Sequence, residues 1–537
     1  MMPATIYNRA RCACHCRVLV VENDSVALKQ QVKNLTQWGY RVNIARGVGQ
    51  HLINDARRQA QQHRCQVALI DMRLLDDDDR NDLSGLELIS RLGPTRAIIL
   101  SSYGDRATAV EALKNKRAFD FVGKEEGPRR LRQAIEEATQ HACACRHGLD
   151  IYWPAGYCAE RIADLFFPHD PTIPRDEVND IIGRLFPHAR TLRLEKISDA
   201  TPTPGMAPRP RSIVLKAWAD DREPVVVKLA RAPKMALEAQ RYAAHVEDRL
   251  HGRFYASIRN SIIYWDLGGA IYTFLGTPLE QMRMFSEFYA ESAIDDIKLA
   301  LARLFETWTP HYQPAKRVPY HNSLFAAYSN VWGKEWRQRL LAYPNQETHI
   351  HFSSINLEGP NPIAWVIKQV GLAGGSEADA SHVSGIWLAV THGDLLGDNV
   401  FIDRDKNAWF IDYERTGLGP ILQDFVELEA DLLTRLVKLP AGNNLDHFYH
   451  LALAVTEPSQ TELRLMAAFQ HPEMAKALKT IHQIRQLARY YTGARDVRQY
   501  LWGLLFNVVF RATLLSEDHP HRERTLLLGS LICRQLS

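Results

Sequence analysis

Short apolar runs alternate with amphipathic helical segments between residues 17 and 140, and this alternation is the strongest constraint on the fold. The strand-like runs cover residues 18–21, 40–44, 67–70, 97–100 and 119–122. The helical segments cover residues 25–39, 52–62, 83–92, 107–115 and 129–140. Because the strand-like runs have no internal polar alternation and helices separate them, they predict a parallel sheet covered on both faces. Residues 17–140 are therefore expected to form a doubly wound α/β domain.

Polar side chains stand directly after four of the predicted strands. They are Glu22 and Asn23, Asp71, Ser101 and Lys124. Ligands of doubly wound sheets bind outside the carboxyl ends of the strands, so these side chains are expected to converge there. Carboxylate oxygens suit Mg²⁺, and an ammonium and a hydroxyl poised over one aspartate suit phosphoryl chemistry. We predict that Asp71 accepts a phosphoryl group and that the Ser101 hydroxyl reports its presence.

Four motifs of this segment stand in the order found in response-regulator receivers, and the segment resembles that family over its whole length. The motifs are VLVVEND, ALIDMRL, AIILSS and AFDFVGK. The resemblance implies a flavodoxin-like fold with Asp71 as phosphoacceptor, Ser101 as switch hydroxyl, Phe121 as switch aromatic and Lys124 as phosphate-binding lysine. It also implies Mg²⁺ bound by Glu22, Asn23 and Asp71, and an upstream histidine kinase as phosphodonor in a two-component phosphorelay.

Three features depart from the receiver pattern. Asn23 stands where the family has a second acidic residue, a run of acids at 76–79 lengthens the loop after Asp71, and no proline follows Lys124. Asp24, the next residue along, is a candidate replacement for the missing carboxylate. The alternative interpretation is a degenerate receiver that is kept as a docking module.

Two clusters of cysteine and histidine bracket the predicted receiver. The first lies in the Cys-rich segment 1–16 and the second begins the irregular, proline-containing stretch 141–190, which we predict to be an interdomain linker. Thiolates and imidazoles brought together could hold Zn²⁺ or an iron–sulfur cluster, while free thiols are the alternative. The members are Cys12, Cys14, His15, Cys16, His141, Cys143, Cys145 and His147.

From residue 191 the pattern changes to short strands with the alternation of an antiparallel sheet, over residues 192–198, 212–219 and 224–230. Lys228 lies inside the third of these, and Glu238 follows in a helical segment. An ion pair between them would orient the lysine toward nucleotide phosphates. Gly205, in a loop rich in proline and glycine, would allow backbone to approach those phosphates. After residue 276 the pattern is mostly helical, which predicts two unequal lobes, 191–276 and 277–537.

The stretch THGDLLGDNVFIDRDKNAWFIDYERTG carries three residues suited to phosphoryl transfer. Asp394 is followed five residues later by Asn399, and Asp412 comes thirteen residues after that. Transfer from ATP needs a base near the acceptor hydroxyl and oxygen ligands that hold Mg²⁺ against the phosphates. Asp394 suits the first role, and Asn399 and Asp412 suit the second.

This stretch resembles the catalytic and metal-binding loops of the aminoglycoside phosphotransferase and choline-kinase branch of the protein-kinase-like superfamily. The resemblance implies an α+β bilobal fold with a mostly helical C-terminal lobe, and ATP and Mg²⁺ as cofactors. It implies Asp394 as catalytic base, Asn399 and Asp412 as magnesium ligands, and Lys228, paired with Glu238, as the phosphate anchor. The expected activity is ATP-dependent phosphotransfer to an unknown hydroxyl or amine. The alternative is a non-catalytic signalling adaptor with a pseudokinase and a docking receiver.

The stretch GLGPILQDFVELEADL, downstream of these loops, is expected to form a helix that carries Asp424, Glu427 and Glu429. We predict that Asp424 braces the catalytic loop by hydrogen bonds. For Glu427 and Glu429 two alternatives remain: they are exposed to solvent, or they face a cationic substrate. The insert at 348–384 is where substrate contacts would vary.

Composition excludes several classes of protein. The chain has 46% apolar and 24% charged residues, which is typical of globular domains, and 537 residues exceed one hydrophobic core. The net charge of +3 is too small to indicate that the chain binds nucleic acid. No apolar run reaches the roughly 20 residues of a membrane span, and no signal peptide is apparent, so we expect a cytoplasmic protein.

Overall fold

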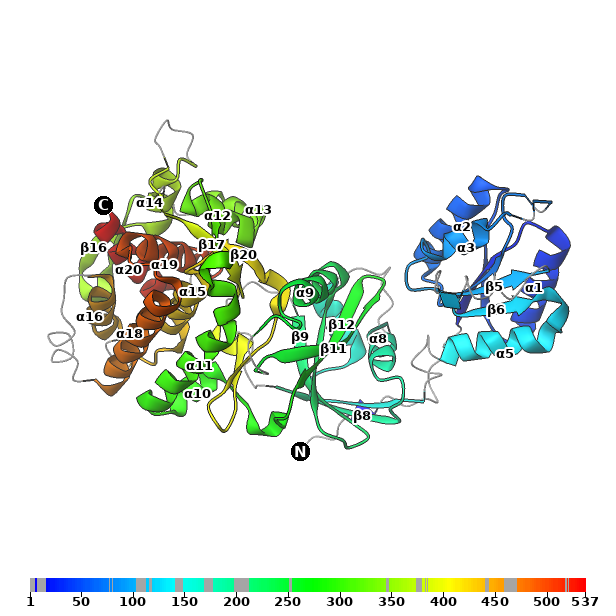
Figure 1. Cartoon of the computed structure of the whole chain (residues 1–537), viewed down its shortest axis with the longest axis horizontal. Helices are drawn as coiled ribbons and strands as arrows, with labels where there is room; N and C mark the ends of the chain where they lie inside the picture. Colours follow the sequence, from blue (N-terminus) through cyan, green and yellow to red (C-terminus); the bar gives the residue numbers. More distant parts are fainter. Residues whose placement is uncertain are drawn as a thin grey trace. The chain divides into compact units, whose positions relative to one another are not determined.

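In a computed structural model, the chain divides into two compact units (Figure 1). The first comprises Met1–Ser198, Pro210–Ala236 and Arg259–Tyr272, and the second comprises Asp199–Arg209, Leu237–Ile258 and Thr273–Ser537. The structure describes residues 5–6, 16–76, 78–79, 81–102, 113–114, 118–140, 148–168, 177–197, 212–250, 254–343, 347–372, 379–381, 383, 385–439, 444–457, 471–516, 519 and 521–537.

The N-terminal part of the first unit is a five-stranded parallel sheet with helices around it. The strands are β2 (Arg17–Val21), β3 (Arg41–Ile44), β4 (Val67–Asp71), β5 (Arg96–Ser101) and β6 (Asp120–Gly123), in the order β3-β2-β4-β5-β6. The helices are α1 (Ser25–Gln37), α2 (Gln50–His63), α3 (Ser84–Ile89) and α5 (Gly127–Gln140). This is the flavodoxin-like order, so the predicted doubly wound fold is confirmed. The helix predicted at 107–115 lies almost wholly outside the described residues.

Alternate residues of the central strands enter two separate hydrophobic clusters. Leu19 and Val21 pack in one cluster with residues of α2 and α3, whereas Val18 and Val20 pack in the other with residues of α1 and α5. Successive strand residues point to opposite faces, and both faces are covered here. The continuous apolar runs in the sequence are therefore buried on both sides.

The rest of the first unit is built on a seven-stranded sheet whose order is β1-β7-β8-β9-β10-β12-β11. Its strands are β1 (Thr5–Ile6), β7 (Asp150–Trp153), β8 (Thr191–Lys196), β9 (Ser212–Ala219), β10 (Val225–Arg231), β11 (Ala256–Tyr264) and β12 (Leu267–Phe274). The ladder from β8 through β9 and β10 to β12 is antiparallel, as predicted from the alternation in the sequence. Parallel β7 and two-residue β1 extend it at one edge.

The prediction of a linker over 141–190 is wrong for the described part of that stretch. It contains β7 and the helices α7 (Ala159–Phe166) and α8 (Glu177–Leu185). Their residues Ile151, Ile162 and Ile181 are fully buried in one cluster with Leu229 of β10. The prolines that indicated a linker fall, in the sequence, between two helices that share one cluster, so they do not mark a boundary between domains. Residues 5–6, assigned to an N-terminal segment, likewise pair with β7.

Most of the second unit is helical, as the sequence predicted for 277–537. Its helices include α10 (Phe285–Glu291), α11 (Ile294–Tyr312), α12 (Leu324–Trp332), α13 (Lys334–Leu341), α14 (Pro362–Gln369), α15 (Gln423–Asp431), α16 (Asn444–Thr456), α18 (Pro472–Thr492), α19 (Val497–Ala512) and α20 (Arg522–Leu536). Helix α9 (Ala232–His245) follows β10 directly. In the described residues, no helix is long and apolar enough to cross a membrane.

Three small sheets accompany these helices. One contains β13 (Arg283–Met284), β18 (Val400–Ile402) and β19 (Ala408–Phe410), and another contains β14 (Val318–Pro319), β17 (Trp387–Thr391) and β20 (Gly417–Pro420). The third, β15 (His349–Phe352) with β16 (Leu357–Pro360), lies in the predicted insert. Strands β17 to β20 frame the stretch that the sequence marks for phosphoryl transfer.

Candidate functional site

Asp71 lies at the carboxyl end of β4, where the predicted phosphoacceptor site is assembled. The Lys124 ammonium is 2.6 Å from Asp71 Oδ1 and 3.0 Å from Glu22 Oε2. Ser101 is buried at the end of β5 and pairs in register with Gly123, the residue before Lys124. The structure thus brings together Glu22, Asp71, Ser101 and Lys124 from four strands.

In the second unit, Asp394 follows β17 and is held by two neighbouring side chains. Asn399 Nδ2 donates hydrogen bonds to the Asp394 carbonyl at 2.7 Å and to its Oδ2 at 3.3 Å. Arg415 Nη1 lies 2.9 Å from Asp394 Oδ1. Gly393 precedes it with φ +77°, and a Cβ there would lie 2.4 Å from the Arg415 carbonyl oxygen. The glycine of the His-Gly-Asp motif is therefore required by this close approach of two backbones.

Asp412 lies beside the same loop because β18 and β19 pair. The Ile411 N–H donates to the Asn399 carbonyl at 3.0 Å, and Val400 pairs with Phe410. Asp412 has the left-handed conformation, φ 67° and ψ 74°, which costs a residue with a side chain about 1 kcal/mol or more. Such strained residues persist where the surroundings hold them, and they concentrate at functional sites. Asp394, Asn399 and Asp412 are thus neighbours in space.

Helix α9 contacts the segment that follows Asp412. Arg241 donates to the Glu414 carbonyl at 2.6 Å, and the Tyr242 and Tyr413 rings have centroids 5.4 Å apart. Glu238 lies one turn earlier in this helix and is fully buried. Lys228 is also buried, in β10, but it belongs to the first unit whereas Glu238 belongs to the second. Gly205 lies outside the described residues.

Three carboxylates of α15 hold the loop around Asp394 by its backbone. Asp424 accepts from the N–H groups of His392 and Gly393 at 2.9 and 3.0 Å. Glu427 accepts from Leu395 at 3.0 Å, and Asp431 accepts from Gly397 at 2.9 Å. Residues spaced by three and four share one face of a helix, so this face acts as an acidic brace, which we define as Asp424, Glu427 and Asp431.

Comparison with known proteins agrees with this geometry for the N-terminal part. Residues 18–136 match the family described as response regulator receiver domain. The N-terminal part of the chain is a response-regulator receiver domain. Residues 334–509, which include Asp394, Asn399, Asp412 and the acidic brace, match the family described as ternary complex associated domain 9.

Two curated relatives are similar to about a fifth of the chain. The acid tolerance regulatory protein ActR is 33% identical over 111 residues, in Rhizobium meliloti (strain 1021) and in Sinorhizobium medicae (strain WSM419). These matches cover 20% of this chain and 51% of each ActR protein, so the chain spans about half the length of the curated relatives it matches.

Two solved structures are also similar to part of the chain. The signal receiver domain of an HD domain-containing protein from Pseudomonas fluorescens Pf-5 is 18% identical, with 24% of this chain and 97% of that chain covered and a TM-score of 0.21. Vibrio cholerae CheY4 is also 18% identical, with 23% and 99% covered and a TM-score of 0.20.

Electrostatics in the receiver domain centre on Lys124. Burial and the nearby Asp71 charge raise the pKa of Glu22. Burial by itself would lower the pKa of Lys124, but the hydrogen bonds and charges of Asp71 and Glu22 outweigh it and raise the pKa. One charged ammonium therefore bridges two buried carboxylates. Asp71 Oδ1 and Glu22 Oε2 both face the Lys124 ammonium, so these two carboxylates also fit a divalent metal ion.

Asp24, the candidate replacement for the missing acidic ligand, caps a helix. Its Oδ1 accepts the Ala27 N–H at 2.6 Å, so its carboxylate caps the N-terminus of α1 and is exposed. Asn23, the residue of the predicted metal set that departs from the family, is half-buried. Phe121 is partly buried against the hydrophobic cluster of the sheet. The structure thus favours a capping role for Asp24, and the suggestion that Asp24 compensates for Asn23 stays a prediction.

The glutamates left open by the sequence are both buried. Burial and the Asp394 charge raise the pKa of Glu427 to about 8. Glu429 accepts from Arg485 and from the Tyr500 hydroxyl, so it is a structural ion pair and neither solvated nor facing a substrate. Burial would raise the pKa of Asp431, but the charges of Arg435 and Arg511 outweigh it and lower the pKa. Arg415 and Asp431 had no signal in a single sequence, because only the folded chain brings them to the loop.

The cysteine clusters fall mostly outside the described residues. This holds for Cys12, Cys14, His15, His141, Cys143, Cys145 and His147. Cys16 is fully buried in the hydrophobic cluster at the start of β2. Among the residues that the structure describes, no group of three histidine, cysteine, aspartate or glutamate side chains is placed to hold a metal ion.

Proposed function

We propose that this chain is a signalling protein in which a phosphorylatable receiver domain regulates an ATP- and Mg²⁺-dependent phosphotransferase. A histidine kinase would supply the phosphoryl group to Asp71. The observation that carries the phosphotransferase proposal is the grouping of Asp394, Asn399 and Asp412 on a loop that the acidic brace holds. The acceptor would be a hydroxyl or an amine.

Each residue has a defined part in the proposed reaction. Bound Mg²⁺, held by Asn399 and Asp412, would neutralise charge on the phosphates. Asp394 would take the proton of the acceptor as the acceptor oxygen or nitrogen bonds to the γ-phosphorus, while the bond from that phosphorus to the β-phosphate oxygen breaks and releases ADP. Lys228 would anchor the phosphates, with Glu238 as its partner.

In the receiver domain, phosphorylation would change the contacts of Lys124. A phosphoryl group on Asp71 would present oxygens to the ammonium that now bridges Asp71 and Glu22. The Ser101 hydroxyl, buried at the adjacent strand end, would turn to one of those oxygens. This rearrangement supplies two discrete states.

A second candidate function is a non-catalytic adaptor, and one contact favours it. The Arg415 guanidinium lies 2.9 Å from Asp394 Oδ1, so the proposed base is already ion-paired. Because the Arg415 guanidinium occupies this oxygen, the oxygen is not free to face an acceptor hydroxyl or amine. In this alternative the second unit binds partners and transfers no phosphoryl group.

Release of ADP by the purified chain with ATP and Mg²⁺ separates the two functions. We expect release above background, lost in Asp394→Ala and in Asp412→Ala, and altered by acetyl phosphate in the wild type. Asp71→Asn serves as the matched control, because it should keep basal release and lose the response to acetyl phosphate. Release no greater than in the two alanine variants, with candidate acceptors added, would favour the adaptor.

A further inference from the structure

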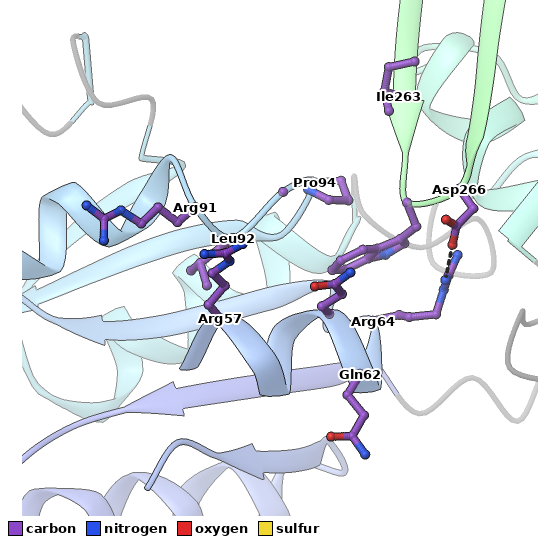
Figure 2. A pocket seen from close by; sticks show the side chains of 11 residues that line it. Arg57, Gln62, Arg64, Arg91, Leu92, Pro94, Ile263 and Asp266 are labelled. Atoms are coloured by element: carbon purple, nitrogen blue, oxygen red, sulfur yellow. Dashed lines mark hydrogen bonds and ion pairs between the residues drawn. The ribbon is translucent and has the colours of Figure 1, made fainter. Parts of the chain in front are cut away.

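Arg64 joins the receiver domain to the second sheet of the first unit. It caps the C-terminus of α2 in the left-handed conformation, and its side chain is 10% exposed. Its Nε and Nη2 donate to the two oxygens of Glu177, at the start of α8. Its Nη1 lies 2.7 Å from Asp266 Oδ2 in the turn between β11 and β12, and its guanidinium stacks 5.6 Å from the Trp265 ring centroid. Figure 2 shows the Arg64–Asp266 contact.

On the receiver side, Arg64 lies at the opposite end of the strand that carries the phosphoacceptor. Strand β4 begins three residues after Arg64 and ends on Asp71, and all five of its residues are buried. Arg17 fixes the start of this strand, because its Nε donates to the Arg64 carbonyl at 3.3 Å and its N–H donates to Gln66 Oε1 at 2.7 Å. A displacement of the strand at Asp71 would therefore be carried to Arg64.

On the other side, α8 packs on β12, the strand that pairs with β10, and β10 carries Lys228. Ile181 and Leu185 of α8 pack at Gly269, where a Cβ would lie 3.2 Å from Ile181 Cγ2 and 2.9 Å from Leu185 Cδ1. Gly269 pairs with Leu229, the neighbour of Lys228 in β10. The missing side chain at Gly269 lets the helix sit on the sheet at this point.

The Asp266 contact leads to the same strand by its backbone. The Asp266 carbonyl accepts the N–H of Ala232 at 2.8 Å. Ala232 is the first residue of α9 and follows Arg231, the last residue of β10. Both contacts of the Arg64 guanidinium thus end at elements that border β10.

The junction is loosely packed around these contacts. A cavity of about 730 Å³ adjoins Arg64, with Arg57, Arg91, Leu92, Pro94 and Ile263 among its lining residues (Figure 2). Close-packed interfaces resist small displacements, whereas one beside a void has room to rearrange. The charged contacts of Arg64 therefore lie beside space in which the junction can rearrange.

We propose that Arg64 is a latch that couples the state of Asp71 to the strand of Lys228, through Glu177 and Asp266. This inference rests on the proposed function for its consequence, namely that the receiver domain regulates a phosphotransferase. Its physical content is narrower: phosphorylation of Asp71 changes the dynamics of α8 and β10 only while Arg64 holds both carboxylates.

Hydrogen exchange of the full chain tests the latch without relying on activity. Peptides from α8 and β10 are compared with and without Mg²⁺ and beryllofluoride, a phosphoryl mimic for Asp71. We expect at least a twofold change in exchange rate in the wild type, and no change in Arg64→Ala or Glu177→Gln. Arg58→Ala is the matched control, because Arg58 lies on the same helix, is mostly exposed and pairs only with Asp55 among the described residues; it should respond like the wild type.

Two further measurements keep the outcomes separate. Exchange of α1 and β6 peptides must respond to beryllofluoride in Arg64→Ala, which shows that its receiver domain is folded and loaded. An Arg64→Ala chain whose α8 and β10 respond as in the wild type, or a wild type in which they do not respond, would overturn the latch. ADP release is followed in parallel, so its absence in every variant would count against the phosphotransferase while the exchange data still decide on the latch.

Discussion

At the scale of single residues, the two sites share one device, a cation that compensates converging carboxylates. Lys124 bridges Asp71 and Glu22 in the receiver domain, and Arg415 pairs with Asp394 in the second unit. Buried charges of one sign are costly unless a partner compensates them. Binding a divalent metal ion or a phosphoryl group must therefore replace or shift these pairs.

The receiver domain has one carboxylate fewer than the receiver pattern, and restoring that carboxylate should strengthen metal binding. We expect Asn23→Asp to raise the Mg²⁺ affinity by roughly tenfold, because a second carboxylate joins Glu22 and Asp71. Titration calorimetry of the full chain measures this affinity. Asp24→Ala is the control: it removes the cap of α1 and should cost stability of about 1 kcal/mol without changing the affinity. An equal gain in both variants would contradict the role of position 23.

Glu427 should make stability depend on pH. Its pKa is raised from 4.5 to about 8, so between these values the folded protein holds a proton that the unfolded chain has released. The free energy of unfolding of the wild type should therefore fall as pH rises through this window, relative to Glu427→Gln, by about 1 kcal/mol or more. Urea unfolding from pH 5 to 9 measures the difference. Parallel curves for the two proteins would mean that Glu427 does not hold this proton.

At the scale of elements, α15 sets the shape of the loop that carries Asp394. Its three carboxylates accept four backbone N–H groups between His392 and Gly397. Hydrogen bonds to charged groups contribute more than neutral ones, about 1.5–3 kcal/mol each. The loop is thus held by its backbone, and its side chains stay available for chemistry.

Loss of one brace residue should affect both stability and the proposed activity. Asp424→Asn has one oxygen where two accepted backbone N–H groups, so we expect a loss of about 2–3 kcal/mol in the free energy of unfolding and a fall in ADP release. Chemical denaturation measures the first effect. Asp446→Asn, on the exposed face of α16, should change stability by less than about 0.5 kcal/mol. Similar losses in both variants would argue against the brace.

At the scale of the whole molecule, the chain contains several separate hydrophobic cores. The receiver domain has two clusters on the faces of its own sheet, and the cluster around Ile181 and Leu229 belongs to the seven-stranded sheet. Cores that share few contacts unfold independently. Signals between them must therefore pass through particular contacts, of which Arg64 is one.

Scanning calorimetry should resolve this division. We expect more than one unfolding transition, with Mg²⁺ and beryllofluoride raising the temperature of the receiver transition, since a ligand at 100 times its dissociation constant stabilises by about 2.7 kcal/mol. Asp71→Asn should remove the shift. A single transition that moves as a whole would mean that the cores unfold together.

Local sequence patterns were sufficient to predict the fold of the receiver domain and to predict which residues of its site lie together. Alternation of strands and helices predicts the parallel sheet, and the ends of those strands place Glu22, Asp71, Ser101 and Lys124 together. The proline-containing stretch 141–190 predicts a linker, but its described part contains β7, α7 and α8. Prolines do not distinguish a connection between domains from a connection between two helices of one domain. An acidic residue before a helix can serve as a cap or as a metal ligand, so the sequence alone could not assign the cap to Asp24.

Residue order alone thus determined the receiver domain, the grouping of its polar residues and the candidate residues of the second site, because periodicity and short motifs act over neighbouring positions. Only the tertiary structure decided which polar groups meet: Arg415 with Asp394, Glu427 with the Leu395 N–H, and Arg64 with Glu177, which is 113 residues away in the sequence. Such pairs depend on long-range packing and on burial, which makes each unpaired charge costly, and a single sequence carries no local signal of either.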